Sequence, residues 1–251
     1  MIYLVETFFS IQGEGRRLGT PSIFFRFGGC NMRCPGFATH VTTPQGEEVI
    51  GCDTAYAVFT KEFKSTWSKV ESAEELMAIV KSYDLHYKAD IVLTGGEPLV
   101  YANDPILVEF LEDVISQGHE VSFETNGALA VDFKKFPIYK ECRFALSVKL
   151  ACSGEAEALR VNFPVLKEII NEAKDAFYKF TLPTEGLESA ATEIKSIIAQ
   201  NSSIDTYCMT MSDSRENLEQ RCENVIEFCK QEGFIYSDRL HIRIWDEIQG
   251  V

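Results

Sequence analysis

The segment "ADIVLTGG" (89–96) is an apolar run that ends in glycines and lies between two segments with helical periodicity. Before it, "SAEELMAIVKSYD" (72–84) begins at Ser72, which together with Glu75 has the pattern of a capping box. After it, "DPILVEFLEDVISQG" (104–118) has the apolar spacing of a second helix. This order of helix, strand and helix predicts a parallel sheet joined by helical crossovers.

The same alternation continues along most of the chain. Further strands are expected at 22–29, 120–127, 142–149, 177–182, 206–211 and 239–245, and further helices at about 164–174, 187–200 and 215–233. About six strand–helix units are too few for an eight-fold barrel, so the predicted fold class is α/β with a partial, open barrel of about six strands.

The chain is expected to form a single domain over residues 1–251. Residues 35–51 break the alternation, because they contain Pro, Gly and Thr and show little helical period. They are interpreted as an inserted hairpin or loop. Residues 239–251 are expected to form a C-terminal strand followed by a tail.

The bulk composition is that of a soluble globular enzyme, with 45% hydrophobic and 25% charged residues. A net charge of −14 with no Lys/Arg block repels nucleic acid and argues against a DNA- or RNA-binding protein. The apolar runs are much shorter than a membrane span, so no membrane contact is expected. The first residues lack the features of a signal peptide, which favours a cytoplasmic protein.

Eight cysteines are present, and in a reducing compartment clustered cysteines bind metal more often than they form disulfides. Cys30 and Cys34 lie in "CNMRCPGF", and Cys52 in "GCDTAY" follows after 17 further residues. Three thiolates suit a 4Fe-4S cluster in which one iron stays open to a bound molecule. The long spacing is tolerable, because lengthening a loop costs only about 0.6 kcal/mol per doubling.

The residues alone leave other ligand sets open. The first two cysteines could bind zinc with His40, with Cys52 or with both, or they could be ordinary loop residues. Cys152 is a rival third ligand, because it lies just beyond a predicted strand end. The remaining cysteines are interpreted as small buried hydrophobic residues: Cys142, Cys208, Cys222 and Cys229.

Each of several predicted strands ends in small residues that can form hydrogen bonds. These strand ends are Gly28–Cys30, Thr94–Glu97, Glu124–Gly127, Ser147–Lys149 and Thr210–Asp213. In such a fold the carboxyl ends of parallel strands meet at one edge, where ligands bind. A binding site formed by these stretches is therefore expected.

The motifs at these strand ends resemble those of a known family. The three-cysteine segment, "TGGEP" (94–98) and "ETNG" (124–127) resemble the radical S-adenosylmethionine (SAM) superfamily. "SIQGEG" (10–15), "FRFGGCN" (25–31), "CDT" (52–54) and the terminal "HIRIW" narrow the resemblance to the 7-carboxy-7-deazaguanine synthase family. The motifs occur in matching order over most of the chain.

The resemblance implies an enzyme that contracts the ring of 6-carboxy-5,6,7,8-tetrahydropterin to 7-carboxy-7-deazaguanine with loss of ammonia. It implies hydrogen abstraction by a 5′-deoxyadenosyl radical, in the biosynthesis of queuosine and other 7-deazapurines. The implied cofactors are a 4Fe-4S cluster with three cysteine ligands, SAM and Mg²⁺. The implied partners are the pterin substrate, a flavodoxin- or ferredoxin-like electron donor and a second copy of the chain in a homodimer.

The resemblance also implies roles for individual residues. The cluster ligands would be Cys30, Cys34 and Cys52, and Thr54 would bind Mg²⁺. The SAM contacts would come from Gly51, Asp53, Gly96, Glu97, Asn126, Ser147, Val148, Lys149, Thr210, Met211, Ser212 and Asp213. The substrate contacts would come from Ile11, Gln12, Gly13, Glu14, Arg26, Thr94 and Val251.

Four of these side chains also have an ordinary structural interpretation. Glu97 could accept a hydrogen bond from the SAM ammonium or could favour a helix start. Arg26 could bind the substrate carboxylate through two hydrogen bonds or could form a structural ion pair. Lys149 could bind SAM or lie solvated at the rim, and Asn126 could be a left-handed turn residue before Gly127.

Two other functions remain open at this point. One is a different radical SAM enzyme, such as a glycyl-radical activase, which acts on a protein backbone. The other is a non-enzymatic zinc-binding module. "SIQGEG" and Arg26 favour a small anionic heterocycle over a protein backbone as the substrate.

Overall fold

The computed structural model describes residues 1–183, 185–200, 204–248 and 250, and in them one nine-stranded sheet dominates the fold. The strand order is β11-β10-β9-β8-β7-β6-β2-β1-β5. Neighbouring strands from β11 to β2 run parallel, whereas β1 pairs antiparallel with both β2 and β5. In chain order the strands are β1 (Ile2–Ile11), β2 (Pro21–Phe27), β5 (Ser68–Val70), β6 (Asp90–Gly95), β7 (Val121–Thr125), β8 (Arg143–Leu146), β9 (Asp175–Leu182), β10 (Thr206–Thr210) and β11 (Ile235–Tyr236).

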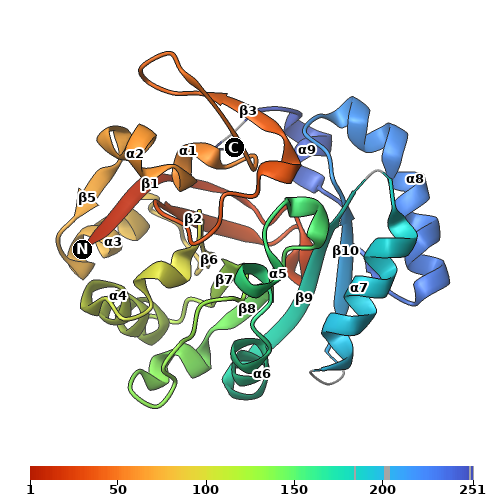
Figure 1. Ribbon diagram of the computed structural model, residues 1–251. Helices are drawn as coiled ribbons and strands as arrows, with labels where there is room; N and C mark the ends of the chain where they lie inside the picture. The colour runs from red at the N-terminus through yellow and green to blue at the C-terminus, as the bar shows by residue number, and fades with distance from the viewer. Residues whose placement is uncertain (184, 201–203, 249, 251) are drawn as a thin grey trace.

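Helices lie around the outside of this sheet (Figure 1). The longer ones are α3 (Ala73–Ser82), α4 (Pro105–Ser116), α6 (Phe163–Glu172), α7 (Leu187–Ala199) and α8 (Arg215–Glu232). The short ones are α1 (Ala55–Val58), α2 (Thr60–Phe63), α5 (Glu157–Arg160) and α9 (Leu240–Trp245), and single 3-10 turns include η2 (Pro35–Phe37) and η6 (Ala151–Ser153). The predicted α/β class with a mainly parallel sheet is confirmed. None of the described helices has the length and hydropathy needed to cross a membrane.

Side chains along each strand alternate between the two faces of the sheet. In β9, Tyr178 and Phe180 are buried in the main core with the helices, whereas Lys179 lies on the opposite face. The core face is mostly Phe, Leu, Ile and Val, so burial of apolar area stabilises the contact between sheet and helices. The opposite face carries polar side chains on several strands: Glu6, Arg26, Thr94, Glu124 and Lys179. This polar face positions the candidate site.

Residues 39–51 form a small hairpin outside the main sheet. β3 (Thr39–Thr42) pairs antiparallel with β4 (Glu48–Gly51), and Gly46 turns the chain with φ +85°. The hairpin projects from the body of the molecule (Figure 1). The sequence predicts an inserted hairpin or loop at 35–51; residues 39–51 pair as a hairpin, and their being an insertion stays a prediction.

One predicted strand is wrong. Residues 239–245 form a helix, α9 (Leu240–Trp245), and the edge of the sheet is occupied by β11 instead. The alternating apolar residues resemble a strand, but the backbone N–H of Leu240 donates to the carbonyl of Gly13 at 2.9 Å and not to a neighbouring strand. Tertiary contacts of this kind outweigh local strand propensity. Val251, a predicted substrate contact, lies outside the described residues.

The capping box predicted at the start of α3 does not form. Ser72 is the N-cap residue, but its side chain accepts no cap hydrogen bond. The Glu75 carboxylate accepts from the backbone N–H of Glu71 at 3.2 Å and not from that of Ser72. The predicted helix boundary is therefore confirmed, while the predicted local contacts are wrong.

The four cysteines interpreted as small core residues are buried in three cases. Cys142, Cys208 and Cys229 belong to the main core, whereas Cys222 on α8 is half-buried. Small apolar side chains suit such positions, because core packing leaves few voids.

Candidate active site

The three candidate cluster cysteines lie together beyond the end of β2. Cys30, Cys34 and Cys52 share one apolar cluster with Met32 and Ala128. Cys34 is buried, and the other two thiols are half-buried. The structure brings the three side chains together, and their ligation of a cluster stays a prediction.

The side chains of the rival ligands are not part of this cluster. Cys152 packs against the main core, and His40 is exposed on the hairpin with its Nδ1 at 3.4 Å from Glu48 Oε2. Among the described residues, no group of three or more His, Cys, Asp and Glu side chains is arranged to hold a single metal ion. Thr54, the proposed Mg²⁺ ligand, has its hydroxyl 3.4 Å from the Sγ of Cys52.

The three thiols fit an iron–sulfur cluster by their chemistry. Thiolates are soft ligands, and each protein thiolate of a cluster binds its own iron, so the sulfur atoms need not meet at one point. Burial raises the pKa of Cys30 and of Cys34 to about 12, and it also raises the pKa of Cys52. The thiols are therefore protonated at neutral pH in the free protein, and binding of a cluster releases protons.

Glu97 joins the ends of β6 and β7. Its side chain is 0% exposed. The carboxylate accepts hydrogen bonds from the Leu99 N–H (2.9 Å), the Thr125 hydroxyl (2.7 Å) and the Asn126 N–H (2.7 Å). Burial raises the pKa of Glu97, while these hydrogen bonds oppose the rise. Its charge also helps to raise the pKa of Cys30, which places it beside the cysteines.

Asn126 connects the end of β7 to the loop that carries the first two cysteines. Its side-chain amide donates to Asn31 Oδ1 at 2.8 Å, and its own Oδ1 accepts from the Ala128 N–H at 3.0 Å. The left-handed conformation is adopted by Gly127 (φ +72°) and not by Asn126, so the interpretation of Asn126 as a left-handed turn residue is wrong. The ends of β2, β6 and β7 meet at one edge, as predicted.

Gly95 and Gly96 bring the end of β6 against the end of β2. A Cβ on Gly95 would lie 2.1 Å from the carbonyl oxygen of Phe27, and one on Gly96 would lie 2.4 Å from that of Gly29. The N–H of Glu97 donates to the same Gly29 carbonyl at 2.9 Å. The two glycines are therefore required for the close contact of two strands.

The residues after β8 face the cysteines. The Lys149 ammonium donates to Ser147 Oγ at 3.1 Å, and its charge opposes the rise in the pKa of Cys34 that burial causes. Lys149 is half-buried and not a fully solvated rim residue. Val148 is buried in the main core, so only its backbone can contact a ligand.

The residues at the end of β10 are turned partly toward the helices. Thr210 lines a small cavity with Leu187 of α7 and Val225 of α8, so its side chain faces the helix layer. The N–H of Met211 donates to the Leu182 carbonyl at 3.0 Å, which extends the pairing with β9. Backbone groups are thus what these two residues offer to the site.

Two further predicted SAM contacts differ in exposure. Ser212 is buried, and its carbonyl accepts a hydrogen bond from Arg239. Asp213 is exposed and accepts from the Asn217 side chain at 2.6 Å, at the start of α8. Gly51 is buried at the end of the hairpin, where a Cβ would lie 3.0 Å from the carbonyl oxygen of Arg33.

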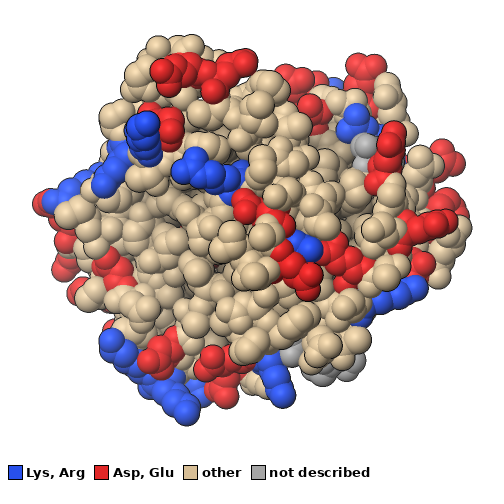
Figure 2. All heavy atoms as spheres, in the orientation of Figure 1, with Lys and Arg blue, Asp and Glu red and all other residues tan. Residues whose placement is uncertain are grey.

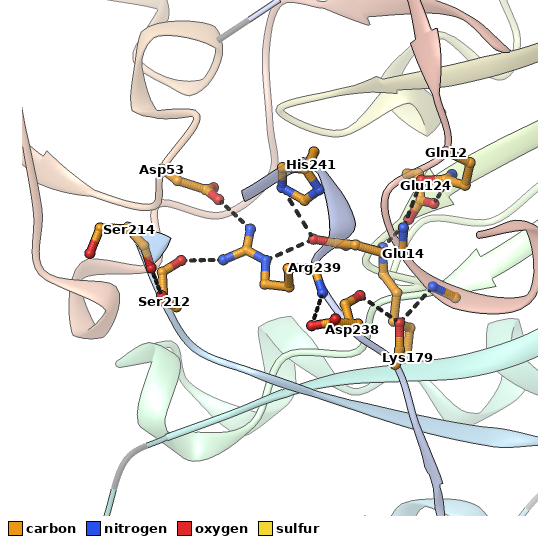
Figure 3. Close-up of polar contacts among 12 residues, drawn as sticks. Gln12, Glu14, Asp53, Glu124, Lys179, Ser212, Ser214, Asp238, Arg239 and His241 are labelled. Carbon is orange, nitrogen blue, oxygen red and sulfur yellow. Dashed lines mark hydrogen bonds and ion pairs between the residues drawn. The ribbon is translucent and has the colours of Figure 1, made fainter. Parts of the chain in front are cut away.

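A group of charged side chains lies on the same polar face of the sheet (Figure 3). The Lys179 ammonium donates to Glu14 Oε2 at 2.9 Å and also to Glu124. The side-chain amide of Gln12 donates to the second oxygen of Glu124 at 3.0 Å. Lys179 is 6% exposed and Glu14 is 13% exposed, so the ion pair is nearly dry. With Arg239, these residues are called the Lys179 network below.

Arg239 extends the Lys179 network toward the hairpin (Figure 3). Its Nε donates to Glu14 Oε1 at 2.9 Å, and one terminal nitrogen lies 3.5 Å from the exposed carboxylate of Asp53. The Nε2 of His241 lies 3.8 Å from Glu14 Oε1. Gly13 leaves room for this imidazole, since a Cβ there would lie 2.1 Å from His241 Nδ1.

The charges of the Lys179 network compensate one another. Burial alone would raise the pKa of Glu14, but Lys179 and Arg239 outweigh it and hold that pKa well below its usual range. Burial alone would lower the pKa of Lys179, but Glu124 and Glu14 raise it. Burial lowers the pKa of His241, so this imidazole is neutral at pH 7. Such mutual pairing is what buried charges require.

Arg26 forms an ion pair within the chain. Its Nε donates to Glu6 Oε1 at 2.6 Å, and the Tyr56 hydroxyl donates to the same oxygen at 3.0 Å. The guanidinium carbon lies 5.8 Å from the centre of the Tyr56 ring. Thr94 is the partner of Arg26 in the register of β2 and β6, so the two side chains lie on the same face.

The backbone groups predicted to contact substrate are bonded within the chain. The N–H of Gln12 donates to the Thr20 carbonyl at 2.8 Å, and the Gln12 carbonyl accepts from Gly19 at 2.8 Å. The carbonyl of Gly13 accepts from α9, and Ile11 ends β1 opposite β2. A carbonyl oxygen has two lone pairs, so each of these carbonyls can accept a second bond.

Sequence reasoning assigned roles to Gln12 and Glu14 and included Glu124 in a strand end of the expected site, but it missed Lys179 and Arg239. Lys179 carried a usable signal, because it is the single charged residue in the strand "FYKFTL". Arg239 carried none, since its contact with Glu14 spans 225 positions.

The surface around the site carries charge of both signs. In Figure 2 a largely uncharged area lies left of the centre of this face, and acidic and basic side chains lie around it. This distribution agrees with the net charge of −14.

Known proteins are similar in sequence to this chain over most of its length. A family model described as "4Fe-4S single cluster domain" matches residues 11–170. A 7-carboxy-7-deazaguanine synthase from Aquifex aeolicus is 32% identical over 80% of this chain and 78% of the relative. The chain belongs to the 7-carboxy-7-deazaguanine synthase family. The 7-carboxy-7-deazaguanine synthase of Halobacterium salinarum is 27% identical over 96% of this chain and 90% of its own.

Two solved structures share the fold of this chain. QueE from Escherichia coli superimposes with a TM-score of 0.61 at 21% identity, over 96% of this chain and 94% of that one. SuiB from Streptococcus suis bound to S-adenosylmethionine gives 0.54 at 13% identity, over 84% of this chain and 48% of that one. The relative from Aquifex aeolicus and the family model confirm the family predicted from the motifs, and the solved structures support the fold alone.

Proposed function

We propose that the chain is a radical SAM lyase that converts 6-carboxy-5,6,7,8-tetrahydropterin to 7-carboxy-7-deazaguanine and ammonia, in queuosine and 7-deazapurine biosynthesis. Membership of the synthase family supports this activity. The observation that carries it is the packing of Cys30, Cys34 and Cys52 into one cluster at the edge where strand ends meet. Substrate and product differ by ammonia alone, so the net reaction needs no external oxidant or reductant.

The three cysteines are proposed to hold a 4Fe-4S cluster with one iron open to SAM. When bound, the cluster and SAM supply a 5′-deoxyadenosyl radical that abstracts a hydrogen atom from the substrate. The chain itself positions the reactants and excludes competing reactions. Its apolar side chains around the thiols, Met32 and Ala128, support a site with little water.

SAM contacts are proposed at the ends of β6, β7 and β8. Each carboxylate oxygen has two lone pairs, so Glu97 can accept from an ammonium beside its three protein donors. Lys149 is half-buried beside Cys34, which suits a partner for the SAM carboxylate. Ser147 and Asn126 are proposed for the ribose and the methionine part. The remaining proposed contacts are Gly51, Asp53, Gly96, Val148, Thr210, Met211, Ser212 and Asp213.

Substrate contacts are proposed on the polar face of the sheet. A guanidinium has five N–H donors, so the bond from Arg26 to Glu6 leaves capacity for the substrate carboxylate. Glu14 is held in its charged form, which suits the donor-rich edge of a pterin. Thr94 lies beside Arg26 on the same face. The backbone groups of Ile11, Gln12 and Gly13, together with Val251, complete the proposed set.

Further parts of the proposal concern partners and a second metal. Thr54 is proposed to bind Mg²⁺, which prefers oxygen ligands, next to the site of Cys52. A flavodoxin- or ferredoxin-like electron donor, a homodimer and a cytoplasmic location are proposed from the family resemblance. The sheet is proposed to be a partial, open barrel with an insertion at 35–51, because its strand order is linear with β11 and β5 at the two edges.

Turnover of the pterin tests this function directly. Anaerobically reconstituted protein with a reductant, SAM and 6-carboxytetrahydropterin should form the chromophore of a deazapurine. Omission of SAM is the control and should leave the pterin unchanged. Cleavage of SAM without that product would indicate another radical SAM enzyme, and colourless, zinc-loaded protein would contradict the proposal.

A further inference from the structure

One carboxylate holds the loop that carries the first two cysteines. Glu155 Oε1 accepts the backbone N–H of Arg33 at 2.6 Å and that of Cys34 at 2.7 Å. Glu155 is 121 positions away from Cys34 in sequence, on the segment that follows β8. Hydrogen bonds to an ionised acceptor are about twice as strong as neutral ones, so this pair of contacts is a strong restraint on the loop.

The loop has an unfavourable backbone that such a restraint offsets. Cys34 has φ +50° and Ala38 has φ +54°, in the left-handed region that is costly for residues with a Cβ. Within the loop, the N–H of Phe37 donates to the Cys34 carbonyl at 3.2 Å. Glu155 therefore supplies a long-range contact at the strained residue itself.

The two segments are also packed backbone against backbone. A Cβ on Gly36 would lie 2.1 Å from the carbonyl oxygen of Cys152 and 2.8 Å from the N of Gly154. Gly154 turns the second segment with φ +78°. A side chain at position 36 would therefore clash with the backbone of residues 152–154, so the two segments are in close contact at this point.

The segment that carries Glu155 is itself anchored in the helix layer. The buried guanidinium of Arg160 donates to the Lys149 carbonyl at 2.9 Å and pairs with Glu193 of α7. The Glu193 carboxylate also accepts the N–H of Ala151 at 2.9 Å. Rigid helix contacts thus extend through residues 149–155 to the cysteine loop.

We propose that Glu155 is a positioning residue for the iron–sulfur site. It holds Arg33 and Cys34 in the binding conformation before metal arrives, and it keeps a negative charge beside the Cys34 ligand afterwards. This inference rests on the proposed function, because it takes Cys34 as a cluster ligand. Added negative charge near a cluster disfavours its reduced form, so the carboxylate lowers the reduction potential.

The first test uses the cluster-free protein and hydrogen exchange at the amides of Arg33 and Cys34. Glu155→Ala should speed their exchange by about ten-fold or more, since it removes charge-assisted bonds to both amides. Glu155→Gln keeps an acceptor of the same shape and should show a smaller increase. Glu157→Gln, at an exposed position two residues further on, is the matched control and should exchange as wild type does. Equal exchange in wild type and Glu155→Ala would overturn the proposal.

The second test uses the reconstituted protein. Glu155→Ala should lose iron to a chelator about ten-fold faster than wild type, and Glu155→Gln should shift the midpoint potential of the cluster upward. Unchanged protection of the β6 amides in each variant shows that the sheet is folded. Wild-type release rates and potentials in both variants would overturn the role of Glu155. Failure of the wild-type chain to take up any cluster would instead sink the proposed function, and the exchange test would still judge the loop contact.

Discussion

The cysteines lie beyond the end of β2 and the Lys179 network lies on the polar face of the same sheet, and the two regions satisfy their side chains in different ways. In the network, Lys179 lies between Glu14 and Glu124, and Arg239 also pairs with Glu14. At the cysteine site, the thiols of Cys30, Cys34 and Cys52 lie among apolar neighbours. The charged groups of the network pair with one another within the chain, although burial still raises the pKa of Glu124, whereas the thiols reach their charged form only when metal binds. One region pairs its charges within the chain, and the other is proposed to be completed by a bound cluster.

The largest effect should come from breaking the network at its centre. Lys179→Met removes the ammonium that two buried carboxylates share and should lower the free energy of unfolding by about 3–5 kcal/mol. Urea denaturation of the cluster-free protein measures this. Lys230→Met, in the exposed pair with Glu227, should cost under about 1 kcal/mol. Equal losses of unfolding free energy in the two variants would show that the buried ion pairs of Lys179 stabilise the protein no more than an exposed pair does.

Acid should weaken the network in a predictable direction. The folded pKa of Glu14 lies below its ordinary value of 4.5, so its contribution to stability is fully present above that pH. It is lost as the pH falls below 4.5 toward the folded pKa, by up to about 2 kcal/mol between pH 4.5 and pH 3. Unfolding followed from pH 7 to pH 3 measures the loss. Glu14→Gln should show a shallower fall, and an identical profile would remove Glu14 from the account.

Beside the cysteines, Glu97 should contribute to the stability of the fold as well as to ligand binding. Glu97→Gln weakens the acceptor for three hydrogen bonds and should cost about 1–3 kcal/mol in the cluster-free protein, measured by urea denaturation. Because the carboxylate is also proposed to bind the SAM ammonium, affinity for SAM should fall in the reconstituted enzyme. Unchanged stability would mean that the strand ends do not depend on it.

A smaller effect is expected at the rim of the network. Gln12→Ala removes one hydrogen bond to Glu124 and should lower the free energy of unfolding by about 1 kcal/mol. Combined with Lys179→Met, it should show less than its separate cost, because both variants act on the same carboxylate. Strict additivity in this double-mutant cycle would indicate that the two contacts are independent.

The smallest effect should be at the hairpin. His40→Ala changes an exposed side chain and should leave the iron content of the reconstituted protein unchanged. Its free energy of unfolding should stay within about 0.5 kcal/mol of wild type. The variant for comparison is Cys52→Ala, at the residue that directly follows the same hairpin. Loss of metal in His40→Ala would revive the zinc ligand set.

Local sequence patterns were enough to predict most of the fold. Apolar runs and helical periodicity gave the strands β2, β6, β7, β8, β9 and β10 and the helices between them, because burial on one face imposes those periods. The prediction of a strand at 239–245 failed. These alternating residues form a helix, and Leu240 and Arg239 contact the region around Gly13. Nothing within seven residues encodes a partner more than 200 positions away.

The site shows the same limit. The cysteines were predictable because metal ligands recur in motifs, and "CDT" marked the third candidate despite the long spacing. The ion pairs of Arg26 with Glu6 and of Lys179 with Glu14 could not be predicted. They depend on which strands become neighbours and on which side chains share a face. Thr210 illustrates the cost of ignoring faces, as its side chain is turned to the helices.

The central claim is that the sulfur atoms at positions 30, 34 and 52 bind one 4Fe-4S cluster, and iron content after anaerobic reconstitution tests it most directly. The account predicts about four irons per chain in wild type and in Cys152→Ala, and almost none in Cys52→Ala. A cluster that survives in Cys52→Ala and disappears in Cys152→Ala would contradict it.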